Sequence, residues 1–199
     1  IDSFNPTVTA RLSAARLNSS NPASSVTFDF SEPVLGFDEN DVFVTGGLLS
    51  DFMAIDSVHY SATFTAADGV ESEGSVSVGT DYTDVRGNAG SGDASSVEMD
   101  TIRPTVTVNL VAALLNDANT SSSVTFEFSE EVVDFDATDV LVNGGVLSDF
   151  AEIDSRHFSA TFSLEFPAAD DQETTGSVSV GTDYTDLAGN SGVSTPSDN

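Results

Sequence analysis

The chain has 199 residues and is strongly acidic, with 33 Asp and Glu against five Arg, no Lys and a formal net charge of −28. This charge repels nucleic acid and anionic membranes, so we expect neither as a partner. The absence of Cys excludes disulfides and cysteine-ligated metals, and no apolar run of about 18 residues is present to span a membrane. Because 39% of the residues are hydrophobic and regularly patterned, we expect a folded protein rather than a disordered one.

Two copies of one sequence fill the chain. Residues 6–65 align with 104–163, and residues 74–90 align with 176–192 after a four-residue insertion; 52 of these 77 aligned positions are identical. Repeats of this length suit whole β-sandwich domains better than helical solenoid units. We therefore predict two domains, residues 1–99 and 100–199. The missing initial Met and signal peptide suggest a fragment of a longer protein.

Apolar and polar residues alternate with period two within each repeat, which is typical of half-buried β-strands. In the first repeat this pattern predicts seven strands, at residues 7–12, 26–30, 42–44, 49–55, 60–64, 76–82 and 94–97. Turns are expected at Gly46-Gly47, Asp68-Gly69 and Gly87-Asn88. The fold class is therefore all-β: two tandem immunoglobulin-like, seven-stranded β-sandwiches in an elongated arrangement.

Acidic residues gather at one expected pole of each sandwich. Many carboxylates at one pole repel one another, and calcium, which takes six to eight oxygen ligands, relieves that repulsion. The expected ligands at the joint between the repeats are Asp100, Glu130, Asp183 and Asp186, supported by the Thr101 carbonyl or Asn190. Their equivalents in the first repeat are Asp2, Glu32, Asp81 and Asp84. The competing interpretation is a solvated acidic surface that binds no specific ion.

Several segments together resemble a known family. These are residues 26–34 (VTFDFSEPV), 37–47 (FDENDVFVTGG), 60–64 (YSATF) and 84–88 (DVRGN). They are similar to the bacterial Ig-like repeats of very large surface adhesins, such as repeats-in-toxin adhesins and biofilm-associated proteins. The resemblance implies an extender module on the bacterial cell surface, with calcium at the joints; it carries this role over to Asp100 and Glu130. The chain departs from the first repeat's pattern at Glu131, where that repeat has Pro33.

Two classes of function follow. The first is a monomeric, extracellular stalk module, stiffened by calcium, whose partners are the neighbouring Ig-like repeats of the same chain. The second is a carbohydrate- or surface-binding module of an adhesin, which would need exposed aromatic side chains. We do not expect an enzyme, because His59 and His157 lie on a predicted outward strand face and so many acids make chance catalytic pairs unavoidable. Tyr82 and Tyr184 share parity with core valines, so we expect them in the core with the hydroxyl bonded near a strand end.

Overall fold

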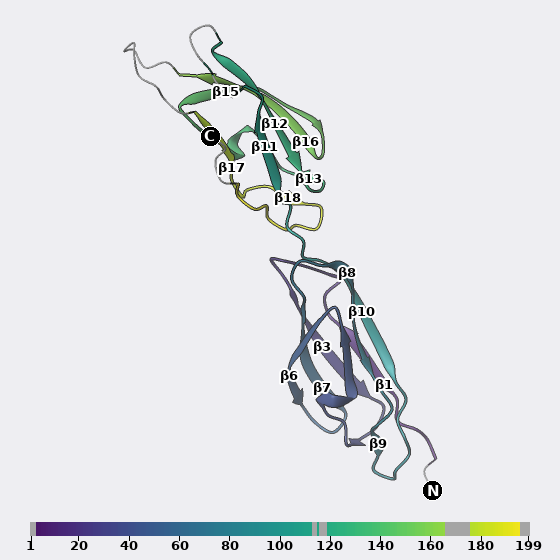
Figure 1. Ribbon diagram of the computed structural model, residues 1–199. Helices are drawn as coiled ribbons and strands as arrows, with labels where there is room; N and C mark the ends of the chain where they lie inside the picture. Colours follow the sequence, from purple (N-terminus) through teal and green to yellow (C-terminus); the bar gives the residue numbers. More distant parts are fainter. Residues whose placement is uncertain (1–2, 113–114, 116–118, 166–175, 196–199) are drawn as a thin grey trace. The chain divides into compact units, whose positions relative to one another are not determined.

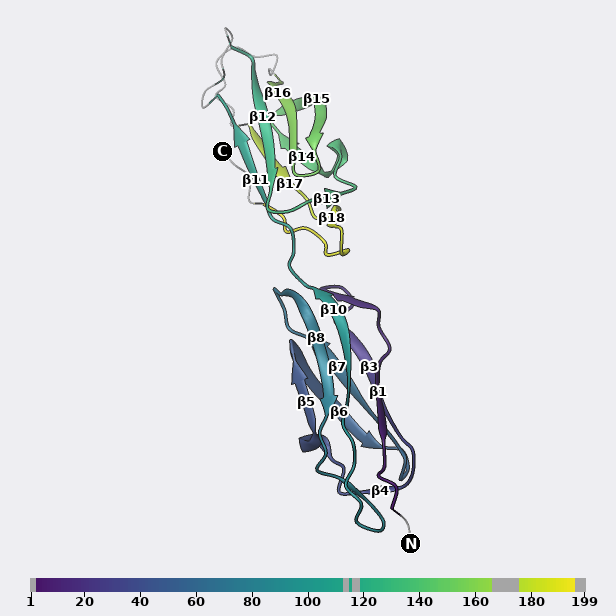
Figure 2. The same cartoon turned by 90° about the vertical axis from the view of Figure 1, so that its right-hand side faces the viewer.

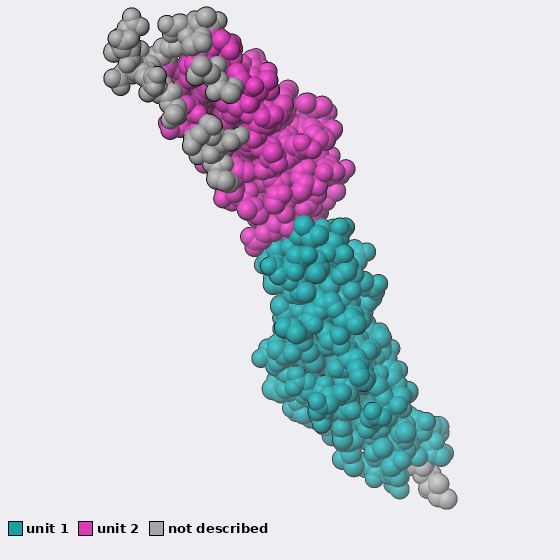
Figure 3. All heavy atoms as spheres, viewed as in Figure 1, with its two compact units in different colours: residues 1–102 teal, residues 103–199 magenta. Residues whose placement is uncertain are grey.

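The computed structural model describes residues 3–112, 115, 119–165 and 176–195. The chain divides into two compact units, residues 1–102 and 103–199, which are coloured separately in Figure 3. Each unit is a sandwich of β-strands, as the alternating pattern predicts (Figures 1 and 2). Among the described residues, no helix is long and apolar enough to cross a membrane.

Unit 1 contains two four-stranded sheets. Seven long strands build them: β1 (Val8–Leu12), β3 (Ala23–Phe30), β5 (Val42–Thr45), β6 (Gly47–Ala54), β7 (His59–Ala66), β8 (Glu71–Val78) and β10 (Asp93–Asp100). The short strand β2 (Arg16–Asn18) joins the second sheet, while β4 (Val34–Leu35) and β9 (Thr83–Asp84) pair with each other. The sheet orders are β1-β3-β7-β6 and β2-β10-β8-β5; β2 runs parallel to β10 and the other pairs are antiparallel.

Unit 2 repeats this plan over the residues that the structure describes. Its longer strands are β11 (Val106–Leu110), β12 (Ser121–Phe128), β14 (Val140–Asn143), β15 (Gly145–Asp154), β16 (His157–Leu164) and β17 (Ser177–Val180). One sheet has the order β11-β12-β16-β15, and β14 pairs with β17. The short strands β13 (Val132–Val133) and β18 (Thr185–Asp186) pair as β4 and β9 do. Single-turn 3-10 helices η1 (Glu39–Asp41) and η2 (Ala137–Asp139) occupy equivalent places.

Each unit has a core built from the inward side of the alternating strands. In β3 and in β12, buried and exposed residues alternate along the whole strand. Aromatic rings fill the centre: Phe37 contacts the rings of Phe28 and Phe30, and Phe135 takes the same place in unit 2. Burying these apolar side chains is the dominant stabilising term of each sandwich.

The structure shifts the ends of all seven strands predicted in the first repeat, and two of them differ most. The strand expected over residues 76–82 begins earlier, at Glu71, and ends at Val78, because at Gly79 the chain turns away and its amide bonds the Asp41 carbonyl at 3.1 Å. The strand expected at 94–97 is longer and runs from Asp93 to Asp100. The two- and three-residue strands β2, β4 and β9 were not predicted, since so few residues carry no periodic signal.

The predicted turns and the interpretation of the tyrosines are confirmed. Gly46, Gly69 and Gly87 have positive φ angles of 74°, 67° and 88°, which suit tight turns. Tyr82 and Tyr184 are both fully buried. The Tyr82 hydroxyl donates to the Ser91 carbonyl at 2.6 Å, and that of Tyr184 to the Val193 carbonyl at 3.2 Å. Tyr82 follows the end of β8, and Tyr184 follows the end of β17.

Candidate metal centre

Glu130 lies on the turn between β12 and β13, which backbone hydrogen bonds hold on both sides. The Phe128 amide donates to the Arg156 carbonyl, and the Val132 amide donates to the Ser155 carbonyl, each at 2.9 Å. The Ser129 amide also bonds the Thr105 carbonyl at 2.9 Å. The turn is therefore fixed against the β15–β16 connection and against the start of the unit.

Asp186 ends β18 and folds the loop that follows it. Its Oδ1 accepts the amides of Ala188 and Asn190 at 2.8 Å, and its Oδ2 accepts the Asn190 side-chain amide at 2.7 Å. The carboxylate is buried, with 3% of the residue exposed. Because each carboxylate oxygen offers about two acceptor positions, Oδ2 can still accept a further partner. Asp186 thus holds its own loop and can also bind a cation.

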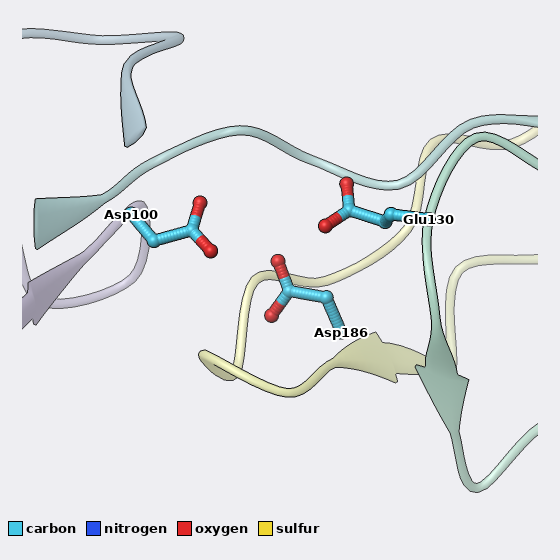
Figure 4. A group of neighbouring side chains, drawn as sticks. All are labelled: Asp100, Glu130 and Asp186. Atoms are coloured by element: carbon cyan, nitrogen blue, oxygen red, sulfur yellow. The ribbon is translucent and has the colours of Figure 1, made fainter. Parts of the chain in front are cut away.

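Glu130 and Asp186 are brought together within unit 2. Carboxylate oxygens of the two residues lie within 4.8 Å of each other, and Figure 4 shows both side chains directed toward the same space. Two carboxylates this close repel each other, which a hard divalent cation with oxygen ligands relieves. The donor chemistry of the pair therefore fits calcium.

Glu32 and Asp84 occupy the equivalent places in unit 1. Asp84 accepts the amides of Arg86 and Asn88 at 2.8 Å and the Asn88 side-chain amide. Burial favours a higher pKa for Asp84, but the hydrogen bonds from Asn88 and from the Arg86 amide outweigh it and hold this pKa below its usual value. The Asp84 carboxylate is therefore ionised, which is the state that a cation ligand needs. Asp2, the fourth residue predicted here, lies outside the described residues.

Asp100 and Thr101 close unit 1. Asp100, also labelled in Figure 4, is the last residue of β10, and its Oδ1 accepts the Ile102 amide at 3.2 Å. The Thr101 hydroxyl donates to the Ala67 carbonyl at 2.8 Å, and the Thr101 amide donates to the Val70 carbonyl. These bonds fix the end of β10 against the β7–β8 turn.

The other predicted ligands lie apart from the pair or support it. Asp81 and Asp183 are exposed in the loops that precede Tyr82 and Tyr184, and neither joins a group of three or more possible ligands among the described residues. Asn190 is buried and bonds Asp186 through both its backbone and its side chain. It therefore shapes the loop that presents Asp186.

Several acids at the predicted poles have local structural roles that the sequence analysis did not foresee. Asp38 and Asp41 form a capping box on η1, and Asp136 and Asp139 form the same box on η2. Asp56 and Asp154 accept backbone amides in the turns before β7 and β16 and contact the ring Nδ1 of His59 and His157 at 2.8–3.0 Å. The spacing of Asp before a short turn is a recognisable signal for such caps.

Comparisons with known proteins place the chain in a family. The model of a bacterial Ig-like domain matches residues 2–99 and again residues 100–199. The chain belongs to the bacterial Ig-like domain family. No curated protein matches it.

Among solved structures, this bacterial Ig-like chain is similar to invasin, described as a bacterial integrin-binding protein, with 17% identity and a TM-score of 0.41 over 87% of the chain. It is also similar to the Yersinia pseudotuberculosis adhesin InvE (15% identity, TM-score 0.39, 96% of the chain) and to InvD of the same organism (15%, 0.32, 96%). The chain spans 36%, 58% and 55% of these three structures, respectively.

Proposed function

We propose that this chain is an extender module in the stalk of a bacterial surface adhesin, of the repeats-in-toxin or biofilm-associated type, and that calcium stiffens the joint between its units. The observation that carries the proposal is the shortness of the link between two anchored ends. A module of this kind would lie outside the cell and would have neighbouring Ig-like repeats as its partners.

The link between the units is two residues long, counted between the nearest backbone hydrogen bonds of each unit. Thr101 is bonded to Val70 in unit 1, and the Pro104 carbonyl accepts the Val193 amide in unit 2, so only Ile102 and Arg103 lie between. Four peptide steps separate Asp100 from Pro104, a span of at most about 14 Å. Covalent geometry therefore keeps Asp100 near the start of unit 2, whatever the angle between the units.

The residues at that end of unit 2 suit a shared cation. The Tyr184 hydroxyl bonds the Pro104 carbonyl at 3.5 Å and Ser129 bonds Thr105, so the loops of Asp186 and Glu130 both begin beside the link. Asp100, Glu130 and Asp186 would supply carboxylate oxygens, with the Thr101 carbonyl as a further donor. Glu32, Asp84 and Asp2 would form the equivalent site of unit 1.

The chemistry supplied by calcium would be electrostatic bridging. Without it, the carboxylates on the two sides of the link repel each other and favour a bent or swinging joint. With calcium bound, the folded state in which the carboxylates converge would be stabilised by the free energy of ion binding. The calcium–carboxylate bonds that neutralise the acids would also limit the motion of the link.

The aromatic side chains support a spacer rather than a carbohydrate-binding module. The chain has no Trp, and its three tyrosines, Tyr60, Tyr82 and Tyr184, are all buried. Phe4 and Phe43 are exposed, but both belong to unit 1, and Leu141 takes the place of Phe43 in unit 2. The two copies also keep the same aromatic core and equivalent acids at Glu32 and Glu130 and at Asp84 and Asp186, as a repeated structural unit would.

The proposal is tested by thermal unfolding of the two-unit chain in millimolar calcium and in chelator, at matched ionic strength and with magnesium as a control. We expect calcium to raise the Tm of the wild type by about 10 °C, which a saturating ligand several hundredfold above its Kd provides. The variant Glu130→Gln keeps the side-chain volume and should lose part of this rise. An equal Tm in calcium and in chelator would refute calcium binding. Small-angle scattering of the same samples then tests whether calcium narrows the range of shapes, as a stiffened joint requires.

A further inference from the structure

We propose that Arg156 is a positioning residue: it fixes the turn that carries Glu130 and thereby sets the cation affinity of unit 2. The inference rests on the proposed function, because it concerns the same site. Arg156 was not among the residues expected to act there, and it lies in the connection between β15 and β16 rather than among the acids.

The guanidinium of Arg156 bonds the carbonyls just before Glu130. Its Nε and Nη2 donate to the Phe128 carbonyl at 3.3 and 3.2 Å, and Nη2 also donates to the Ser129 carbonyl at 2.8 Å. The planar fork of a guanidinium fixes the direction of both carbonyls at once, which a flexible ammonium cannot do. This side chain therefore restrains the peptide leading into Glu130, in addition to the backbone bonds that hold the turn.

The backbone of the same short segment holds the other side of the turn. The carbonyls of Arg156 and Ser155 accept the amides of Phe128 and Val132, each at 2.9 Å. Side-chain and backbone bonds from residues 155 and 156 thus enclose Glu130 on both sides along the chain. A shift of this segment would move the carboxylate as well.

The anchoring segment is itself held in place. Asp154 Oδ1 accepts the amides of Arg156 and His157, both at 2.9 Å, and contacts the His157 ring Nδ1 at 2.8 Å. Asp154 therefore stabilises the turn that bears Arg156, and Arg156 in turn bonds the Glu130 turn. Support for Glu130 thus passes from Asp154 through Arg156 to the peptide before the carboxylate.

Unit 1 holds the equivalent turn with the same backbone bonds, since the amides of Phe30 and Val34 donate to the carbonyls of Val58 and Ser57, but its side chains differ. Val58 stands where unit 2 has Arg156; it packs against the core and has no side-chain donor. Directly after Glu32, unit 1 has Pro33, whose ring fixes its own φ angle and restricts the residue before it. Unit 2 has Glu131 there. Unit 2 thus lacks the proline within the turn and has, on the neighbouring β15–β16 connection, an arginine that bonds the turn, which is why we assign the arginine a positioning role.

Charge and positioning make opposite predictions for the removal of Arg156. If the arginine acted only through its charge, removing a positive group beside an acidic site would tighten calcium binding. If it positions Glu130, its removal loosens the carboxylate and weakens binding, as loss of an outer support does at metal sites. The direction of the change in Kd therefore decides between the two roles.

The experiment is calorimetric titration of calcium into the complete two-unit chain and its variants. Arg156→Val installs the residue that unit 1 folds with, and Arg156→Lys keeps the charge without the fork. Arg11→Val, on the exposed side of β1, removes an equal charge from unit 1 as a control. Glu130→Gln identifies which part of the titration belongs to this site.

We expect the Kd of the Glu130-dependent site to rise on the order of tenfold in Arg156→Val. It should stay raised in Arg156→Lys and remain unchanged in Arg11→Val. A Kd in Arg156→Val equal to or lower than that of the wild type would overturn the positioning role. If the wild type titrates as Glu130→Gln does, the proposed calcium site fails, and with it the effect on affinity.

Hydrogen exchange in chelator distinguishes failure of the positioning role of Arg156 from failure of the calcium site. The amides of Phe128 and Val132 should exchange faster in Arg156→Val than in the wild type or in Arg11→Val, with or without a calcium site. Unchanged exchange of both amides would show that Arg156 does not hold the turn.

Discussion

The aromatic centres of the two units match closely, whereas the turns that carry Glu32 and Glu130 share their backbone bonds but differ in the side chains that restrain them. Ring centroids of Phe30 and Phe37 lie 4.8 Å apart, as do those of Phe128 and Phe135. At the turns, Pro33 and Val58 of unit 1 are replaced by Glu131 and Arg156. Close packing allows one arrangement of rings for a given strand spacing, while a turn can be fixed by any group that limits its backbone. The repeats can therefore differ at their poles without a change of core.

The largest expected effect tests the equality of the two cores. Phe37 contacts five other rings, and Phe135 contacts the five equivalent rings of unit 2. We expect Phe37→Ala and Phe135→Ala each to lower the free energy of unfolding of their own unit by about 3–5 kcal/mol, through lost burial and the cavity left behind. Denaturant unfolding of the full chain, followed by NMR signals of each unit, measures both. Costs that differ by more than about 2 kcal/mol would mean that the cores relax differently despite their matching geometry.

A smaller effect is expected at a loop position where the units differ in backbone strain. Gly36 and Asp134 are equivalent, and both have a left-handed φ, 81° and 61°. Glycine adopts this region freely, while a side chain makes it costly, so Asp134→Gly should stabilise unit 2 by up to about 1 kcal/mol.

The reverse change, Gly36→Asp, serves as its matched partner. Nothing lies within 4 Å of a Cβ added at Gly36, so this variant should lose stability through backbone strain alone. Thermal melts of the two variants should shift in opposite directions. Shifts of the same sign would mean that the Asp134 side chain has a role beyond tolerating the turn.

The smallest expected effect concerns pH at the turn before β7. The hydrogen bond to Asp56 raises the pKa of His59, with added attraction from Asp56 and Asp29, while the Val58 amide and the His59 ring lower the pKa of Asp56. The histidine therefore stabilises the fold fully below its unfolded pKa of about 6.5, and this contribution is lost as pH rises through its folded pKa. The aspartate contributes above about pH 4 and is lost at lower pH.

NMR titration of the His59 ring measures this effect directly. We expect a pKa above 6.5 in the wild type and a lower value in Asp56→Asn, which keeps the shape of the side chain but removes its charge. A pKa that does not move in Asp56→Asn would assign the shift to Asp29 across the strand pair instead.

The sequence predicts most of the sandwich because its signals are local. Period-two alternation marks the long strands, and glycines that need positive φ mark turns such as Gly69. Strand ends and two-residue strands depend on distant partners: β9 forms only because Thr83 and Asp84 meet Leu35 and Val34. No periodicity within the chain could indicate that pairing.

For the candidate site, the sequence alone determined which residue types were available. The repeat and the acidic loops named Glu130 and Asp186 as possible ligands, because equivalent acids recur at equivalent turns. Only the tertiary structure decided which acids converge and which ones cap local turns. It also showed that Arg156 bonds the carbonyls of the two residues before Glu130. Local pattern fixes which way a strand residue faces, whereas convergence of loops from separate strands depends on how the sheets pair and pack.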